Sequence, residues 1–366
     1  MDTKMKNKVV MAVLIASFLG LAVSSWFKPA NQFSDSERRA LEQFPQLSVK
    51  SILSGNFMSD FEDYTLDQFP FRDGFRNIKA VVASYLFGQS DNNDIYVEDG
   101  YVSKMEYPLK EDTIKRAGER FRYVYDKYLA ETDASVYVSI VPDKNYFMAE
   151  ESGHLALDYD VLTETLLREM EFAEYIDIMG ELSLEDYYKT DTHWRQECIM
   201  DVAESLGNAM GVQLAGTYEE KVLDNPFYGV YYGQAALPLP AEEIKYLSSD
   251  VLSGCKVYDY QNEKEIGIYD FEKAYGKDPY EMFLSGTLSL ITIENPEASI
   301  EKELILFRDS FGSSIAPLLV EGYSKITLVD IRYIHPDMLE KYIEFDNQDV
   351  LFLYSTLVLN NAETIK

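Results

Sequence analysis

Cysteine and histidine are scarce in this sequence of 366 residues. Cys198 and Cys255 are the only cysteines, which excludes a disulfide framework and a zinc site built from cysteine ligands. The only histidines are His154, His193 and His335, so a metal centre with several histidine ligands is not expected. We therefore expect a protein that works without a metal ion or another cofactor.

Basic side chains are few relative to acidic ones, with 33 Lys and Arg against 63 Asp and Glu and a formal net charge of −30. This imbalance, with an isoelectric point near 4.4, excludes a nucleic-acid partner, which requires a basic footprint. It also argues against docking through broad basic patches on an anionic lipid surface. A hydrophobic share of 46% and a charged share of 26% are typical of a globular protein.

A long uncharged run, Val9–Phe27, follows Lys4, Lys6 and Lys8 at the N-terminus. At about 1.5 Å per residue, a helix of this length spans the hydrocarbon core of a bilayer. The lysines are expected to stay in the cytoplasm, so the rest of the chain is expected to be exported and held at the cell membrane. Trp26 suits the membrane interface and favours an uncleaved anchor. The alternative is a cleaved signal peptide and a secreted protein.

Two parts of the chain are therefore expected. Residues 1–30 carry the cytoplasmic lysines and the transmembrane signal anchor, and residues 31–366 form one extracytoplasmic domain. Within that domain, residues 216–286 are irregular and rich in Tyr, Gly and acidic side chains, which is typical of an insertion of strands and long loops.

Strands and helices alternate in the exported part. Its apolar runs are typical of parallel strands covered on both faces, and they are SVYVSIVP (135–142), ELILF (303–307), KITLVD (325–330) and DVLFLYS (349–355). Apolar residues at helical spacing predict helices at 110–130, 159–171, 313–321 and 336–344, and another just after Trp194. The expected fold is an α/β domain with a largely parallel sheet.

Two shorter signals are local. Asp99-Gly100 lies between strand-like segments and predicts a hairpin turn. Ser34 and Glu37 have the spacing of a capping box, which predicts a short helix starting there.

The segment FRDSFGSS (307–314) joins an apolar strand to a helix. At this kind of junction an open α/β sheet carries its ligand crevice, and Ser310 would be exposed there. The first helical N–H groups could stabilise an oxyanion beside it. The simpler interpretation is that Ser310 or Ser313 caps the helix. The sequence lacks G-x-S-x-G, so the nucleophile turn of an α/β-hydrolase is not supported.

The segment YYKTDTHW (187–194) offers a base for such a serine. A nucleophilic serine needs a base to take its proton, and the base needs a carboxylate to fix its tautomer. His193 and Asp191 would supply these roles to Ser310. The simpler interpretation is that Asp191 or Thr192 caps the following helix and that His193 is a surface or core residue. Taken together, the two segments favour catalysis.

With these residues the chain resembles the DHHW family of bacterial exported proteins and, more distantly, the alginate O-acetyltransferases, which share an SGNH-hydrolase-like domain. The resemblance rests on the order and spacing of seven strings, which are DQFPFRD (67–73), VPDKNYF (141–147), YYKTDTHW (187–194), FYGVYYG (227–233), FLSGTLSLITIENP (283–296), FRDSFGSS (307–314) and LVDIRY (328–333). Thr192 replaces the middle histidine of the family's Asp-His-His-Trp. Ser285-Gly286-Thr287 stands where related sequences often carry Gly-Gly-Asn.

The resemblance implies a circularly permuted, three-layer α/β/α domain with Ser310 as nucleophile, His193 as base and Asp191 as its orienting acid. It implies an O-acetyltransferase or acetylesterase that acts on a cell-surface polysaccharide or another O-acetylated glycan. A polytopic membrane acyltransferase could supply the acetyl groups. The alternative is a carbohydrate-binding or polysaccharide-assembly protein that keeps the fold without turnover.

Three further side chains are candidates for contacting the substrate. Arg332 and Tyr333 follow the strand KITLVD, and their alternative roles are a strand-end salt bridge and a packed aromatic ring. Lys144 follows the strand VSIVP, where an exposed lysine is common in any protein.

Overall fold

The computed structural model describes residues 3–214 and 216–366, which form two compact units. The first unit contains the described residues up to Asn92 together with Tyr232–Pro238. The second contains Asn93–Tyr231 and Leu239–Lys366. The boundary near residue 30 that the sequence suggests depends on membrane insertion and stays a prediction.

Helix α1 (Thr3–Phe27) begins the first unit, and none of its side chains is buried. Its most apolar window has a mean hydropathy of 2.2, and it is the one helix among the described residues that is long and apolar enough to cross a membrane. It fits the signal anchor expected from the sequence. The orientation of the chain across the membrane stays a prediction.

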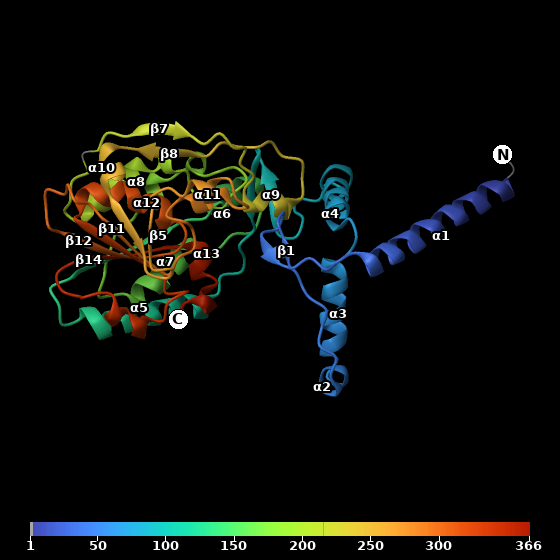
Figure 1. Ribbon diagram of the computed structural model, residues 1–366, viewed down its shortest axis with the longest axis horizontal. Helices are drawn as coiled ribbons and strands as arrows, with labels where there is room; N and C mark the ends of the chain where they lie inside the picture. Colours follow the sequence, from blue (N-terminus) through green and yellow to red (C-terminus); the bar gives the residue numbers. More distant parts are fainter. Residues whose placement is uncertain (1–2, 215) are drawn as a thin grey trace. The chain divides into compact units, whose positions relative to one another are not determined.

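The remainder of the first unit is a small hairpin with short helices (blue in Figure 1). Its elements are β1 (Phe33–Ser34), β2 (Arg39–Ala40), α2 (Val49–Leu53), α3 (Asn56–Asp67), α4 (Arg72–Val81) and the π-helix η1 (Val82–Leu86).

The helix predicted at Ser34 is wrong, because β1 and β2 pair there as an antiparallel hairpin. The Ser34 hydroxyl does accept a bond from the Glu37 N–H at 3.2 Å, as a cap would. The Glu37 carboxylate, however, pairs with Arg72 and Arg76 of α4. Because arginines distant in the sequence bind the Glu37 carboxylate, it is not available to complete the capping box at Ser34.

The second unit is built on an eight-stranded sheet with the order β10-β9-β11-β13-β12-β14-β5-β6. Strands β13, β12, β14, β5 and β6 run parallel to one another, whereas β11, β9 and β10 add antiparallel pairs beyond β13. The strand bounds are β5 (Ser135–Val141), β6 (Glu174–Tyr175), β9 (Lys256–Asp259), β10 (Lys264–Ile266), β11 (Leu290–Glu294), β12 (Glu303–Arg308), β13 (Lys325–Val329) and β14 (Asp349–Ser355).

Helices cover both faces of this sheet, which gives three layers (Figure 1). On one face lie α5 (Glu111–Val124) and α7 (Tyr159–Glu169), and on the other lie α8 (Met200–Ala209) and α12 (Gly312–Leu319). The predicted α/β/α architecture with a largely parallel sheet is confirmed.

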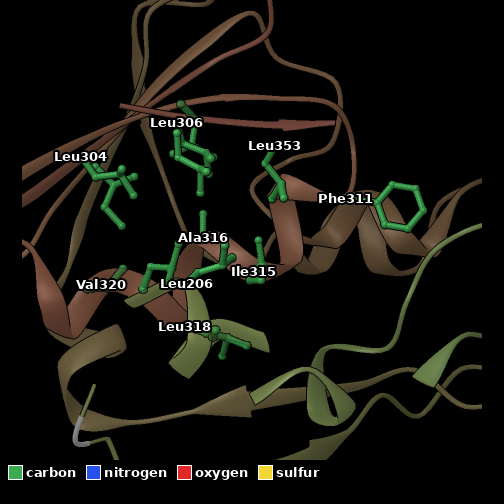
Figure 2. Packing of buried hydrophobic residues seen from close by; sticks show 14 of the residues in the cluster. Leu206, Leu304, Leu306, Phe311, Ile315, Ala316, Leu318, Val320 and Leu353 are labelled. Carbon is green, nitrogen blue, oxygen red and sulfur yellow. The ribbon is translucent and has the colours of Figure 1, made fainter. Parts of the chain in front are cut away.

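The central strands are mostly apolar because alternate residues enter different cores. Along β12, Leu304 and Leu306 join the core that contains α8 and α12, whereas Ile305 and Phe307 join the core that contains α5 and α7. Figure 2 shows Leu304 and Leu306 above Ala316 of α12. The strand is therefore held from both sides up to the residue where the site begins.

The segment 216–286 is only partly an insertion. It contains β7 (Glu219–Val222), β8 (Lys245–Ser248), α9 (Val230–Ala235), α10 (Asp250–Gly254), α11 (Phe271–Ala274) and the 3₁₀ turn η6 (Pro279–Met282). It also contains β9 and β10, which extend the main sheet. Strand β9 alternates exposed and buried residues, so it lacks the continuous apolar run that marks the central strands.

The remaining elements complete the second unit. They are the hairpin β3 (Ile95–Glu98) and β4 (Tyr101–Lys104), the helices α6 (Lys144–Ser152) and α13 (Thr356–Leu359), and the short helical turns η2 (Tyr125–Leu129), η3 (Met179–Glu181), η4 (Leu184–Asp186), η5 (Gln196–Cys198), η7 (Val320–Gly322), η8 (Pro336–Lys341) and η9 (Ala362–Thr364). The predicted turn at Asp99-Gly100 is confirmed, with a positive φ at both residues.

Candidate active site

Ser310 lies in the short connection between the end of β12 and the start of α12, and it is partly exposed. Strand β12 sits between β13 and β14, so this connection opens at the carboxyl edge of the parallel strands. The sequence predicted this position for Ser310.

Asp191 and His193 are held in a loop whose two sides are joined by backbone contacts. Tyr187 and Trp194 form an isolated antiparallel bridge, and the Tyr188 N–H donates to the His193 carbonyl at 3.1 Å. The loop turns both side chains toward one place, although Asp191 is completely buried and His193 is 9% exposed.

Ser310, His193 and Asp191 form one continuous row of hydrogen bonds. The His193 Nε2 lies 2.7 Å from the Ser310 Oγ, and the His193 Nδ1 lies 2.6 Å from the Asp191 Oδ1. A proton on Nδ1 that is donated to the carboxylate leaves Nε2 as the acceptor for the serine hydroxyl. The row can therefore take a proton from the hydroxyl as it attacks an electrophile. The catalytic roles themselves stay predictions.

A second contact fixes the Asp191 carboxylate from the opposite side. The Val230 N–H donates to the Asp191 Oδ2 at 2.9 Å, and the Gly229 N–H donates to the Thr190 Oγ1 at 2.9 Å. A Cβ at Gly229 would lie 2.3 Å from the Thr190 carbonyl oxygen and from the Asp191 nitrogen, so only glycine allows this approach. Gly229 and Val230 belong to the string FYGVYYG (227–233), which the sequence analysis noted only as part of the family resemblance. Their backbone N–H groups hold Thr190 and Asp191 in place.

Tyr280 of η6 is a site residue that the sequence analysis missed. Its ring stacks on the His193 imidazole with centroids 3.8 Å apart and planes within 7°. The Tyr280 hydroxyl shares a 2.8 Å hydrogen bond with the Ser314 Oγ, which also accepts from the Trp194 Nε1 at 2.8 Å. Burial raises the pKa of Tyr280 well above its ordinary value, so the ring stays neutral. This stack keeps the imidazole in one plane.

Asp309, next to the serine, fixes the backbone around it. Its completely buried carboxylate accepts from the Phe311 N–H at 3.0 Å and from the Ser355 N–H and hydroxyl at 2.8 and 2.7 Å. The Gly312 N–H donates to the Asp309 carbonyl at 3.2 Å. The Ser313 N–H donates to the Ser310 carbonyl at 3.2 Å. Three N–H groups at the start of α12, where the sequence suggested donors for an oxyanion, are therefore already bonded within the protein. The positive end of α12 still points toward Ser310.

Lys144 is 2% exposed and lies against the segment that precedes Asp191. Its Nζ donates to the carbonyls of Tyr188 and Lys189 at 2.8 and 2.9 Å and lies 5.2 Å from the centre of the Tyr231 ring. Burial lowers the pKa of Lys144 to about 7, and the charge of Asp191 partly opposes that change. A substrate contact from Lys144 stays a prediction.

Arg332 and Tyr333 lie just after β13. The Arg332 guanidinium binds the Asp330 carboxylate through two hydrogen bonds, of 2.9 and 2.7 Å, and stacks 5.4 Å from the Tyr333 ring centre. Asp330 also lies 4.0 Å from the buried Arg308, two residues before Ser310. Tyr333 is 50% exposed and available to a ligand. Substrate binding by Arg332 and Tyr333 stays a prediction.

Two other features of the chain bear on the site. The Ser285 hydroxyl donates to Asp270 at 2.8 Å within a turn in which Leu284, Ser285 and Gly286 all have positive φ. In the part of the chain that the structure describes, no group of three or more His, Cys, Asp or Glu side chains could hold a metal ion.

Solved structures share this fold. A DHHW family protein from Eubacterium siraeum matches with a TM-score of 0.59 at 19% identity, over 75% of this chain and 95% of that chain. PatB1 from Bacillus cereus matches with a TM-score of 0.53 in two structures. The structure with a sulfonyl adduct is 18% identical over 72% of this chain and 97% of that chain, and the other is 17% identical over 75% and 99%.

At these identities the likeness shows the fold alone. It confirms the SGNH-hydrolase-like α/β class and the resemblance to a DHHW family protein at the level of the fold. Neither a protein-family model nor a curated protein sequence matches the chain.

Proposed function

We propose that the protein is an extracytoplasmic O-acetyltransferase or acetylesterase that modifies a cell-surface polysaccharide through an acetyl-serine intermediate. The observation that carries this proposal is the row of hydrogen bonds from Ser310 through His193 to Asp191. A serine that only caps a helix needs no histidine partner, and a histidine that only packs needs no buried carboxylate.

In the proposed reaction, the Ser310 Oγ attacks the carbonyl carbon of an acetyl ester while the His193 Nε2 takes its proton. The resulting oxyanion lies near the positive end of α12. Collapse of the tetrahedral intermediate expels the donor alcohol, which receives the proton from His193. A sugar hydroxyl or water then attacks acetyl-Ser310 with His193 again as base, which gives transfer in the first case and hydrolysis in the second.

Asp191 would hold the imidazole in the required tautomer and stabilise its positive charge after proton transfer. The Val230 N–H keeps the Asp191 carboxylate oriented, and Tyr280 keeps the imidazole in plane. These are positioning contacts, since neither group reaches the reacting atoms.

A structural neighbour supports a reactive nucleophile, and the resemblance in sequence supports an acetyl group. The Bacillus cereus neighbour has been seen with a sulfonyl adduct, a covalent product that requires a nucleophile in that protein. The resemblance to alginate O-acetyltransferases favours an acetyl ester on a glycan. A single N-terminal apolar helix favours a protein held at the cell membrane, where a polytopic acyltransferase could supply acetyl groups.

Mutation of the row tests the proposal in the full-length protein. Ser310→Ala should remove turnover of a chromogenic acetyl ester and cost at most about 2 kcal/mol of stability, the usual worth of a cap. His193→Ala should be nearly as inactive and the double variant no worse, because the residues act as a unit. Asp191→Asn should fold normally and lose about 10⁴-fold in kcat through the wrong tautomer.

A different pattern would refute the enzyme. Ser310→Ala with a lower melting temperature and unchanged turnover would make the serine a cap alone. A parent protein without ester turnover that nevertheless binds glycan would favour the carbohydrate-binding alternative.

A further inference from the structure

A pocket of about 280 Å³ opens beside the loop that carries Asp191, within the second unit. Tyr188, Lys189 and Thr190 line one side, and Arg195 and Glu197 line another. None of the three residues of the hydrogen-bonded row lines it. We call it the Tyr188 pocket.

Unsatisfied polar atoms concentrate at the Tyr188 pocket. Among the residues that the structure describes, six buried side-chain nitrogen or oxygen atoms have no hydrogen-bond partner, and three of them belong to residues lining this pocket. They are the Tyr188 Oη, the Arg195 Nε and the Glu197 Oε2. Each such atom costs about 1–3 kcal/mol when it is left without a partner, so three in one place indicate that a ligand supplies partners there.

Two of the three side chains that hold these atoms are well buried. Tyr188 is completely buried, and the Glu197 side chain is 6% exposed. The Arg195 side chain is 34% exposed, and its Nε lies 3.1 Å from the Glu197 Oε1 in an ion pair whose geometry does not make a hydrogen bond. Because Arg195 is the most exposed of the three, it is the side chain that can turn aside to admit a ligand group.

The charged side chains that line the Tyr188 pocket balance in number, with Lys189, Arg195 and Lys245 against Glu197, Glu242 and Glu243. Arg195 pairs with Glu197, and Lys245 pairs with Glu220 at 2.8 Å. The Glu242 carboxylate accepts from the Lys189 N–H at 2.5 Å and from the Thr190 N–H and hydroxyl at 2.7 and 2.6 Å. An anionic ligand would therefore meet no uncompensated positive field, in a chain whose formal net charge is −30.

A neutral sugar fits the three unsatisfied atoms. Neighbouring sugar hydroxyls can accept from a guanidinium N–H and donate to a carboxylate oxygen at the same time, and a third hydroxyl can either donate to or accept from a phenol. We propose that the Tyr188 pocket is a binding subsite for a neutral sugar residue of the glycan, separate from the residues that carry out the acyl transfer. Its place in glycan modification rests on the proposed function, whereas sugar binding itself does not.

Binding of simple sugars to the full-length protein tests the proposal. The probes are glucose, N-acetylglucosamine and glucuronate, followed by saturation-transfer NMR in a detergent without a sugar headgroup. Glucose or N-acetylglucosamine should give saturation transfer, and glucuronate should give little. Tyr188→Phe and Glu197→Gln should each weaken binding about tenfold, the loss expected for one hydrogen bond to a charged or buried group.

Tyr187→Phe is the matched control, because the Tyr187 hydroxyl already donates to the Pro142 carbonyl at 2.6 Å. It should lower the melting temperature and leave sugar binding unchanged. Tyr188→Phe should keep or raise the melting temperature, since it removes a hydroxyl without a partner. Glu197→Gln provides an independent variant if Tyr188→Phe folds poorly.

Any of these results would overturn the proposal: no saturation transfer with either neutral sugar, equal sugar binding by Tyr188→Phe and the parent, or tighter binding of glucuronate. Ser310→Ala should bind sugar as the parent does, and loss of binding in that variant would also overturn it. Retained ester turnover in Ser310→Ala would refute the proposed enzyme and leave the sugar-binding result untouched, so the two failures are distinguishable.

Discussion

Replacing Tyr280 tests whether the stacked ring holds His193 in its working orientation. Tyr280→Leu removes a ring whose centroid lies 3.8 Å from that of the imidazole, and it also removes the hydroxyl bonded to Ser314. Tyr280→Phe removes the hydroxyl and keeps the ring. The pair therefore separates the stack from the hydrogen bond.

The two variants should differ in both stability and rate. Tyr280→Phe should cost about 1 kcal/mol for one buried hydrogen bond, since Ser314 keeps its bond from Trp194. Tyr280→Leu should cost about 3 kcal/mol, because the stack and part of the packing are lost as well. A misplaced catalytic group costs roughly 10²-fold in rate for an ångström of displacement, so kcat of Tyr280→Leu should fall by about 10- to 100-fold.

Steady-state turnover of an acetyl ester, with melting curves of the same samples, provides the assay. KM should change little in either variant, because Tyr280 is buried and does not meet the substrate. Tyr280→Phe should retain kcat close to that of the parent. A folded Tyr280→Leu protein with the parent's kcat would refute the positioning role, and equal losses in both variants would transfer that role to the hydroxyl.

Three further predictions concern the surroundings of the site and the thiols. Burial lowers the pKa of Lys144 to about 7, so folding leaves it neutral above that pH while the unfolded chain stays protonated. Between pH 7 and pH 10, the free energy of unfolding of the parent, measured with denaturant, should rise relative to that of Lys144→Met by about 4 kcal/mol at most. Parallel pH profiles of the two proteins would contradict this. Gly229→Ala would bring a Cβ within 2.3 Å of the backbone of Thr190 and Asp191, so it should lower ester turnover at least about tenfold. Gly254→Ala is the control, because there is open space around Gly254, and it should leave turnover unchanged. Equal turnover in the two variants would contradict the crowding argument. Cys198 and Cys255 are free in the structure, so thiol titration of the denatured, unreduced protein should find two thiols, and a mass increase of two hydrogens on reduction would contradict this.

The parallel core of the fold could be predicted from the sequence because its strands are buried on both faces. Strands β12, β13 and β14 fall within one residue of the apolar runs at 303–307, 325–330 and 349–355. Strand β10 at the edge of the sheet and its neighbour β9 escaped notice because both are at least half exposed and carry no continuous apolar run.

The candidate row could be predicted because its members lie in short local patterns. Asp191 and His193 are two residues apart, and Ser310 marks a junction of strand and helix. Tyr280 and Val230 could not be predicted, since a stacked ring and a backbone N–H leave no spacing pattern in the chain. The helix predicted at Ser34 was wrong because local spacing does not show contacts with residues distant in the sequence. Arg72 and Arg76, from a later helix, pair with the acidic side chain that the capping pattern requires.

Covalent labelling by a sulfonyl fluoride tests the central claim most directly. The account predicts that the full-length protein gains one sulfonyl group, that peptide mass spectrometry locates it on Ser310, and that Ser310→Ala gains none. Labelling of His193→Ala should be far slower, because without the histidine no base takes the proton from the Ser310 hydroxyl as it attacks the sulfonyl fluoride. A parent protein that gains no group, gains it on another residue, or labels equally fast without His193 would contradict the account.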